Sequence, residues 1–337
     1  MSSSSTPEPP GDEATPLALD EVELALEEVE EVEAILEQQP PKAEAALGEG
    51  ARGSRGSGWV TTALAAPGFV YIGFYLVAPL VIIILVSFWT WTDAGFQKTW
   101  TTANYSELFN DSTYWHNMLS TFETSLIAVA ACLVLGFPVA YFLALKVESL
   151  RIQIALFIVA LAPFWTSFLT RAIAWTFPLM GREGALNQVL IKLQIVSQPV
   201  QDFGFSTLSV RLAMIQLYIL FMITPLFFSL AQVDRAALEA ARDLGGNWWR
   251  TFREVILPQT MPGIVIGSIF IFVLTMGDYG TVATVGGGNI TSVGTLIYSK
   301  IGAVQYPQGA ASAVLLVIVL MIGVWVITRF SNLREEL

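Results

Sequence analysis

The chain has 337 residues, of which 54% are hydrophobic and only 13% are charged. Soluble globular domains carry about 25% charged residues, so this composition excludes an ordinary soluble protein and indicates one that lies largely in lipid. The formal net charge of -11 does not describe the whole chain. Of the 28 acidic residues, 14 lie in residues 1–60, together with only three of the 17 basic residues. The rest of the chain is neutral.

Residues 1–60 are predicted to be an acidic, largely disordered tail and linker. Residues 1–20 are rich in Ser and Pro, a composition that buries too little apolar surface to fold. Apolar residues recur at heptad-like spacing among the glutamates of residues 20–38, which fits either a short partner-binding helix or a solvated acidic helix. Pro and Gly make residues 40–58 a flexible linker. The folded domain is therefore expected at residues 61–337.

Six apolar runs in this domain are long enough to cross a bilayer. A hydrocarbon core of about 30 Å requires roughly 20 apolar residues in a helix, and helices satisfy their own backbone hydrogen bonds in lipid. The expected spans are 68–90, 121–145, 152–174, 209–231, 260–283 and 308–330. The predicted fold class is an all-α polytopic membrane protein with six transmembrane helices.

Prolines and glycines lie within these runs. The prolines inside four of the spans, where a kink is tolerable, are Pro79, Pro138, Pro163 and Pro225. Gly263 and Gly267 form a G-x-x-x-G pattern at the start of the fifth span, which permits close contact between helices.

Basic residues predict the orientation of the spans. With the N-terminus in the cytoplasm, the inner segments hold eleven Lys and Arg residues and the outer segments hold six. Because inner loops carry the excess of positive charge, both termini and loop 234–258 are expected in the cytoplasm. Loops 91–120, 175–208 and 284–307 are then outside.

The polar loop 234–258 is predicted to begin with a short helix. Asp234 is a suitable N-cap, and Arg235–Leu244 is rich in strong helix formers. Gly245 is expected to stop this helix, since glycine readily adopts the left-handed conformation of a helix end.

A second helix is expected directly after this stop. Asn247 is placed to cap it, and Trp248, Phe252 and Ile256 then share one face. Pro258 is expected to end the helix at the membrane.

The loop also contains a spaced motif. Glu239, Ala240 and Ala241 are followed after three residues by Gly245, and after nine more by Val255-x-Leu257-Pro258. This pattern resembles the EAA motif of the membrane permeases of ABC importers, although Val255 stands where that family usually has Ile. The resemblance covers about residues 65–335, and the alternative is an ordinary amphipathic helix on the membrane surface.

The resemblance implies that loop 234–258 holds a cytoplasmic coupling helix, just before the fifth span, which docks on a separate ATPase subunit. The residues that it assigns to this coupling are Glu239, Ala240, Ala241, Gly245, Leu257 and Pro258. The chain has no G-x-x-x-x-G-K-[ST] phosphate loop. ATP hydrolysis is therefore expected on the partner, and this chain is expected not to be an enzyme.

Two further segments indicate which group of ABC importer permeases the chain resembles. The first is Pro163-Phe164-Trp165-Thr166-Ser167 with Arg171, Trp175 and Gly181-Arg182-x-Gly184-x-x-Asn187, and the second is Gly277-Asp278-Tyr279. Both are similar to segments of spermidine/putrescine permeases, although permeases for iron, sulfate or thiosulfate share parts of them.

A polyamine requires carboxylates for its ammonium groups and aromatic faces for its body. The substrate-path candidates are Asp278, Tyr279, Trp165, Thr166 and Glu123. Asp278 is the acidic residue deepest in an apolar run, which marks it as a functional candidate, and Glu123 is expected to open the second span from outside. The alternatives are that Asp278 caps a broken helix or pairs with a neighbouring chain, that Glu123 lies among headgroups, and that Trp165 is an interface anchor.

The partners follow from the resemblance and from the number of spans. Six spans are few for a transport path, so a second homologous permease is expected, with two ATPase subunits, an extracytoplasmic substrate-binding protein and the bilayer of a bacterial inner membrane.

With one His and one Cys, no metal site, cofactor or nucleophilic triad is expected, and no nucleic acid is expected. The rival functions are a secondary transporter or channel, or a membrane scaffold for the acidic tail.

Overall fold

The computed structural model describes residues 58–92, 95–147, 149–176, 183–200 and 203–330. The acidic tail expected at residues 1–60 therefore lies outside the described residues up to residue 57. The chain divides into two units, Met1–Leu76 and Val77–Leu337. The first unit is described from Gly58 onward, where helix α3 (Gly58–Ser87) begins.

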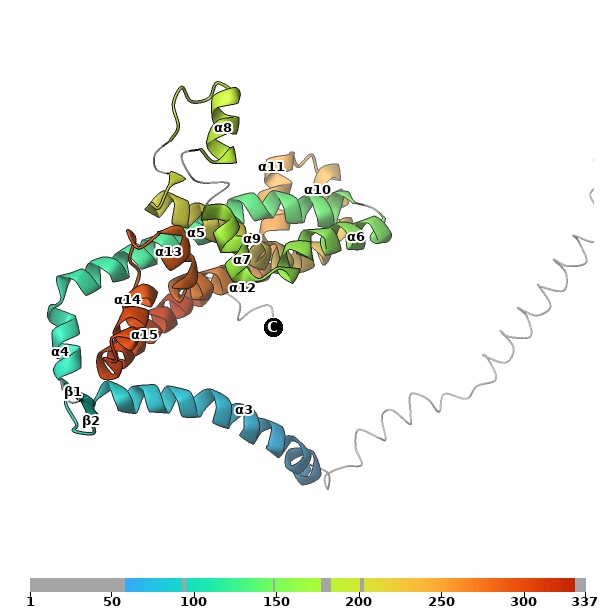
Figure 1. The fold of residues 1–337 in the computed structure, drawn as a ribbon. Helices are drawn as coiled ribbons and strands as arrows, with labels where there is room; N and C mark the ends of the chain where they lie inside the picture. The colour runs from blue at the N-terminus through green and yellow to red at the C-terminus, as the bar shows by residue number, and fades with distance from the viewer. Residues whose placement is uncertain (1–57, 93–94, 148, 177–182, 201–202, 331–337) are drawn as a thin grey trace, which may run out of the picture. The chain divides into compact units, whose positions relative to one another are not determined.

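The described residues are mainly helical (Figure 1). The long helices after α3 are α5 (Ser112–Tyr141), α9 (Thr207–Ala231), α12 (Leu257–Met276) and α15 (Tyr306–Phe330). The shorter helices are α4 (Ala103–Asn110), η1 (Phe142–Lys146), α6 (Leu150–Leu161), η2 (Ala162–Trp165), α7 (Phe168–Ala174), α8 (Ala185–Lys192), α10 (Arg235–Asp243), α11 (Trp248–Thr251), η5 (Phe252–Ile256), α13 (Gly280–Val285) and α14 (Val293–Gly302). A short hairpin pairs strand β1 (Thr90–Thr92) antiparallel to β2 (Gly95–Gln97).

The predicted fold class is confirmed. Within the described ranges, five helices are long and apolar enough to cross a membrane, and a bent pair of helices makes a sixth candidate. The fourth and sixth spans, expected at 209–231 and 308–330, agree with α9 and α15 to within two residues at each end. The chain is therefore an all-α polytopic membrane protein.

The third span is not the single helix expected at residues 152–174. It runs from Arg151 to Trp165, then bends by 86° and continues as α7. Pro163 lies in the 3-10 turn η2 that precedes the bend, and Thr166 follows in an extended conformation. The helix therefore breaks just after a proline, which lacks the N–H of a helical hydrogen bond, rather than kinking mildly.

The second and fifth spans also differ from expectation. The second span starts earlier than residue 121, at Ser112, where the Asp111 side chain accepts a hydrogen bond from the Thr113 N–H. The fifth span runs from Trp248 to Met276. Its helix ends at Gly277 rather than near residue 283, and Asp278 lies between α12 and α13.

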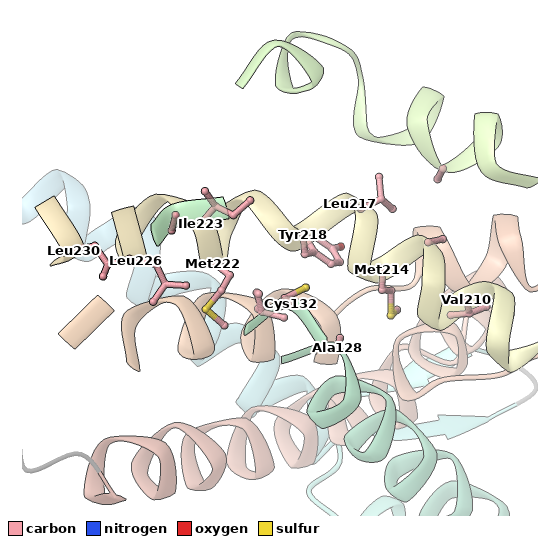
Figure 2. Close-up of a cluster of buried hydrophobic side chains, with 14 of the residues drawn as sticks. Ala128, Cys132, Val210, Met214, Leu217, Tyr218, Met222, Ile223, Leu226 and Leu230 are labelled. Carbon is pink, nitrogen blue, oxygen red and sulfur yellow. The ribbon is translucent and has the colours of Figure 1, made fainter. Parts of the chain in front are cut away.

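Helix α9 occupies the centre of the larger unit and packs against both α5 and α12. Its buried side chains recur at three- and four-residue spacing, as Figure 2 shows for Met214, Tyr218 and Met222. Ala128 and Cys132 of α5 belong to the same buried cluster. A second cluster joins α15 to α4, α5, α12 and α14.

Two glycines set the close approach of α12 to α9. A Cβ atom built on Gly263 would lie 2.6 Å from the Pro225 carbonyl oxygen, and one on Gly267 would lie 2.6 Å from the Met222 Sδ. Real Cβ atoms do not approach so closely. The two glycines of the G-x-x-x-G pattern therefore permit close contact between helices, as the sequence predicts. Any larger side chain at Gly263 would push these two helices apart.

Candidate functional site

The first short helix of loop 234–258 forms as the sequence predicts. The Asp234 side chain accepts a hydrogen bond of 2.8 Å from the Ala236 N–H at the start of α10. Gly245 then adopts a left-handed conformation with φ of 75°, and the Gly246 N–H donates to the Ala241 carbonyl at 2.9 Å. The expected glycine stop is therefore confirmed.

The second short helix begins as expected but does not end at Pro258. The Asn247 side chain caps α11 by accepting a 2.8 Å hydrogen bond from the Arg250 N–H. The helix continues through the π-helical turn η5 into α12, and Pro258 lies in the first turn of α12. Proline is tolerated there because its missing N–H falls where the helical pattern is already interrupted. The loop is thus continuous with the fifth span.

One face of this element is open and lined by small side chains. Ala237, Ala240 and Ala241 border a groove of about 610 Å³ whose other wall includes Thr251 and Val255. Small residues here allow a partner's surface to approach the helix backbone closely.

The apolar and charged groups beside this groove are exposed. Leu244, at the end of α10, is 84% exposed. Glu239 is exposed as well.

Asp278 lies in the break between α12 and α13 and is only 7% exposed. Its Oδ2 accepts a hydrogen bond from the Tyr218 hydroxyl at 2.9 Å, and its Oδ1 accepts one from the Thr281 N–H at 2.9 Å. Asp278 therefore caps the start of α13, which was one of the alternatives for this residue. A buried carboxylate at a helix break is also a common feature of ion and substrate sites in transporters.

Aromatic rings surround this break. The Tyr279 and Tyr298 rings stack at a centroid distance of 4.9 Å and an angle of 10°, and both are exposed. On the other side, the Phe168 ring stacks on Tyr218 at 5.9 Å. A Cβ on Gly280 would lie 3.7 Å from Phe168 and 3.8 Å from the Asp278 Oδ1, so the break in the fifth span adjoins the broken third span.

Trp165 and Thr166 occupy the bend of the third span. Trp165 is 84% exposed, and the Thr166 hydroxyl donates to the Pro163 carbonyl at 2.7 Å. No described contact joins either residue to Asp278. The α7 residue that contacts α9 and α13 is Phe168 instead, whereas the Arg171 guanidinium lies 5.0 Å from the centroid of the Phe164 ring.

Glu123 lies inside α5 rather than at the start of the second span. It forms an ion pair of 2.8 Å with Arg211 of α9, and the Arg211 Nε donates to the Thr124 hydroxyl at 3.3 Å. The described structure joins Glu123 and Asp278 by no contact. The Glu123 charge is therefore already matched by a cation, which weakens its candidacy as a substrate ligand.

The remaining residues of the third-span signature include Gly181, Arg182 and Asn187. Gly181 and Arg182 lie outside the described residues. The Asn187 side chain accepts a hydrogen bond from the Val200 N–H at 2.9 Å and donates to the Val200 carbonyl. It therefore holds the loop after α8.

Sequence reasoning missed Tyr218, Arg211 and Tyr298. A tyrosine hydroxyl or an arginine within an apolar span requires a polar partner, so Tyr218 and Arg211 carried a usable signal. Tyr298 carried none, since an aromatic residue in the expected loop 284–307 is unremarkable by itself.

Comparison with known proteins adds the family. The chain is 34% identical over 264 residues to the spermidine/putrescine transport system permease protein PotB of Salmonella typhimurium, which covers 78% of this chain and 90% of that protein. It is also 31% identical over 266 residues to the inner membrane ABC transporter permease protein YdcU of Escherichia coli K12, covering 75% and 82%. The chain belongs to the ABC transporter permease family.

The fold of this ABC permease is also found among solved structures. A chain in the crystal structure of a bacterial alginate ABC transporter, in complex with a periplasmic protein bound to an alginate pentasaccharide, superposes with a TM-score of 0.60. The match covers 81% of this permease and 94% of that chain at 14% identity, and it therefore supports the fold alone. No family model matches the sequence.

Proposed function

We propose that this permease forms half of the translocation path of an ATP-driven polyamine importer, with spermidine and putrescine as its substrates. It works with a second homologous permease, two ATPase subunits and an extracytoplasmic substrate-binding protein. It lies in the bacterial inner membrane with both termini in the cytoplasm. Residues 1–60 are its acidic tail, and residues 61–337 are its permease domain.

The observation that carries the substrate proposal is the Asp278 carboxylate at the broken fifth span. Two hydrogen bonds hold it in place, and the exposed Tyr279–Tyr298 pair lies beside it. An ammonium group pairs with the carboxylate, while the rings stabilise the cation through their faces. The name of the PotB relatives, spermidine/putrescine permease, agrees with this chemistry.

Trp165, Thr166 and Glu123 belong to the outer part of this path in the proposal. Irregular backbone at membrane depth is tolerated where it lines a cavity or contacts protein, which favours a path beside the bend at Thr166. Glu123 is paired with Arg211, so we assign it a supporting place at the mouth rather than direct binding.

The coupling proposal rests on loop 234–258. In this account α10 docks on an ATPase subunit through Glu239, Ala240 and Ala241, and Gly245 sets the turn that presents it. Because α11 continues through η5 into α12, a displacement of this element moves the fifth span directly. The helical connection at Leu257 and Pro258 transmits that movement toward Asp278.

Transport then follows as alternating access. ATP binding closes the two ATPase subunits, and their movement rocks the helices of each permease from inward-open to outward-open. The breaks at Thr166 and Asp278 mark the level at which the path changes its access.

The test is uptake of labelled spermidine by cells that lack their own polyamine importers. The permease is supplied with its binding protein, ATPase and second permease, and unlabelled putrescine, thiosulfate and iron are offered as competitors. The expected result is ATP-dependent uptake that putrescine alone inhibits. Competition by thiosulfate or iron would assign another solute, and uptake that survives ATP depletion but collapses with the proton gradient would identify a secondary transporter.

A further inference from the structure

A separate pocket of about 380 Å³ lies where the end of the second span meets loop 234–258. Its walls come from α5 and η1 on one side and from α10, α11 and η5 on the other. It shares Gly246 and Thr251 with the groove beside Ala240 and Ala241, but its other lining residues are different, and Tyr141, Leu145 and Lys146 belong to neither the substrate path nor the coupling surface.

The polar groups of this pocket are suited to an anion. Lys146 is the last residue of the second span, and it is exposed without an ion pair among the described residues. Tyr141 adds a hydroxyl one turn earlier. An ammonium and a phenol hydroxyl are both hydrogen-bond donors, and a phosphate oxygen accepts from both.

Thr251 supplies an independent observation. The residue lines the pocket and is only 8% exposed, yet its Oγ1 has no hydrogen-bond partner in the described structure. Native proteins nearly always satisfy a buried hydroxyl. The oxygen itself is buried, so a bound phosphate would accept from this hydroxyl only after the side chain turns toward the pocket.

The remaining walls are apolar. Leu145, Leu238 and Trp248 line the pocket, and the Trp248 ring stacks on Phe252 at a centroid distance of 5.5 Å. Tryptophan at the end of a span is typical of the level of lipid headgroups. A ligand with both an anionic and an apolar part therefore fits better than a free ion.

We propose that this pocket binds the phosphate headgroup of an anionic phospholipid. The phosphate lies against Lys146, Tyr141 and Thr251, and the glycerol and upper acyl chain lie against Leu145 and Trp248. Because the lipid contacts the end of the second span and loop 234–258 together, it stabilises the position of the coupling element. The proposal does not depend on which solute is transported.

The experiment uses the complete transporter in nanodiscs of phosphatidylcholine with or without phosphatidylglycerol, with native mass spectrometry to count retained lipids. Wild type is expected to retain phosphatidylglycerol selectively, and Lys146→Gln to weaken that retention by about tenfold, as loss of one charge-assisted contact implies. Thr251→Val is expected to give a smaller loss. Lys192→Gln, an exposed lysine of α8, is the matched control and should retain lipid like wild type.

Three outcomes would overturn the proposal. One is equal retention of the two lipids by wild type. Another is unchanged retention of phosphatidylglycerol in Lys146→Gln, which would leave the pocket to a protein partner. The third is displacement of phosphatidylglycerol by inorganic phosphate at low concentration, which would assign the site to free phosphate. Lys146 is exposed, so its variant tests the site even where Thr251→Val disturbs packing.

Discussion

Replacing Asp278 by Asn removes a negative charge from the proposed substrate path while both hydrogen bonds remain possible. The amide oxygen still accepts from the Thr281 N–H, and the amide nitrogen donates to the Tyr218 hydroxyl oxygen, which accepts in place of donating. The fold should therefore survive, and the loss of charge is the change that is tested.

The expected loss follows from the hydrogen bond between a carboxylate and an ammonium group. Such a bond contributes about 1.5–3 kcal/mol net, and each 1.4 kcal/mol corresponds to about a factor of ten in affinity. The spermidine concentration for half-maximal uptake should therefore rise roughly 10- to 150-fold in Asp278→Asn.

The assay is initial-rate uptake of labelled spermidine over a range of concentrations, normalised to the amount of permease in the membrane. Asp111→Asn is the matched control, because Asp111 also caps a helix through its side chain but lies at the exposed start of α5. Unchanged half-maximal uptake in Asp278→Asn, at normal abundance, would refute the assignment of Asp278 to the substrate.

Two other substitutions test the packing and the outer ion pair. Gly263→Ala should destabilise the permease by about 1–3 kcal/mol through overpacking of α9 against α12, whereas Gly302→Ala, which meets no atom within 4 Å, should not; equal thermal stability of the two variants in detergent would contradict the close helix approach. Glu123→Gln should change half-maximal spermidine uptake by less than about fivefold, because an exposed ion pair contributes at most about 1 kcal/mol. A loss as large as that of Asp278→Asn would instead make Glu123 a direct ligand.

The apolar spans could be predicted from the sequence because lipid demands long apolar helices. Residues 209–231 and 308–330 were located to within two residues of α9 and α15. The Asp234 cap and the Gly245 stop were predictable for a different reason, since both depend on neighbours only a few residues away.

The helix breaks could not be predicted in the same way. Pro138 and Pro225 remain inside continuous helices, whereas the helix at Pro163 breaks. Proline is tolerated in membrane helices where neighbouring groups satisfy the freed carbonyl. The outcome at each proline therefore depends on tertiary surroundings that a local pattern does not contain.

The residues that hold Asp278 in place could not be predicted from the sequence either. Its partner Tyr218 lies 60 residues earlier in the chain, and Glu123 pairs with Arg211 across 88 residues. Both pairs depend on the packing of α9 against its neighbours, which a single sequence does not reveal. The sequence shows only that Asp278 is a carboxylate within an apolar run. That predicts a functional site there but not which residues surround it.

The proposed transport mechanism requires α10 to transmit force from an ATPase subunit. The direct measurement is co-purification of the ATPase with the permease, together with ATP-driven spermidine uptake in proteoliposomes, for wild type, Glu239→Lys and the matched outer-loop control Glu183→Lys. We expect Glu239→Lys to lose both ATPase association and uptake, and Glu183→Lys to keep both. Unchanged association and unchanged uptake in Glu239→Lys would contradict this mechanism.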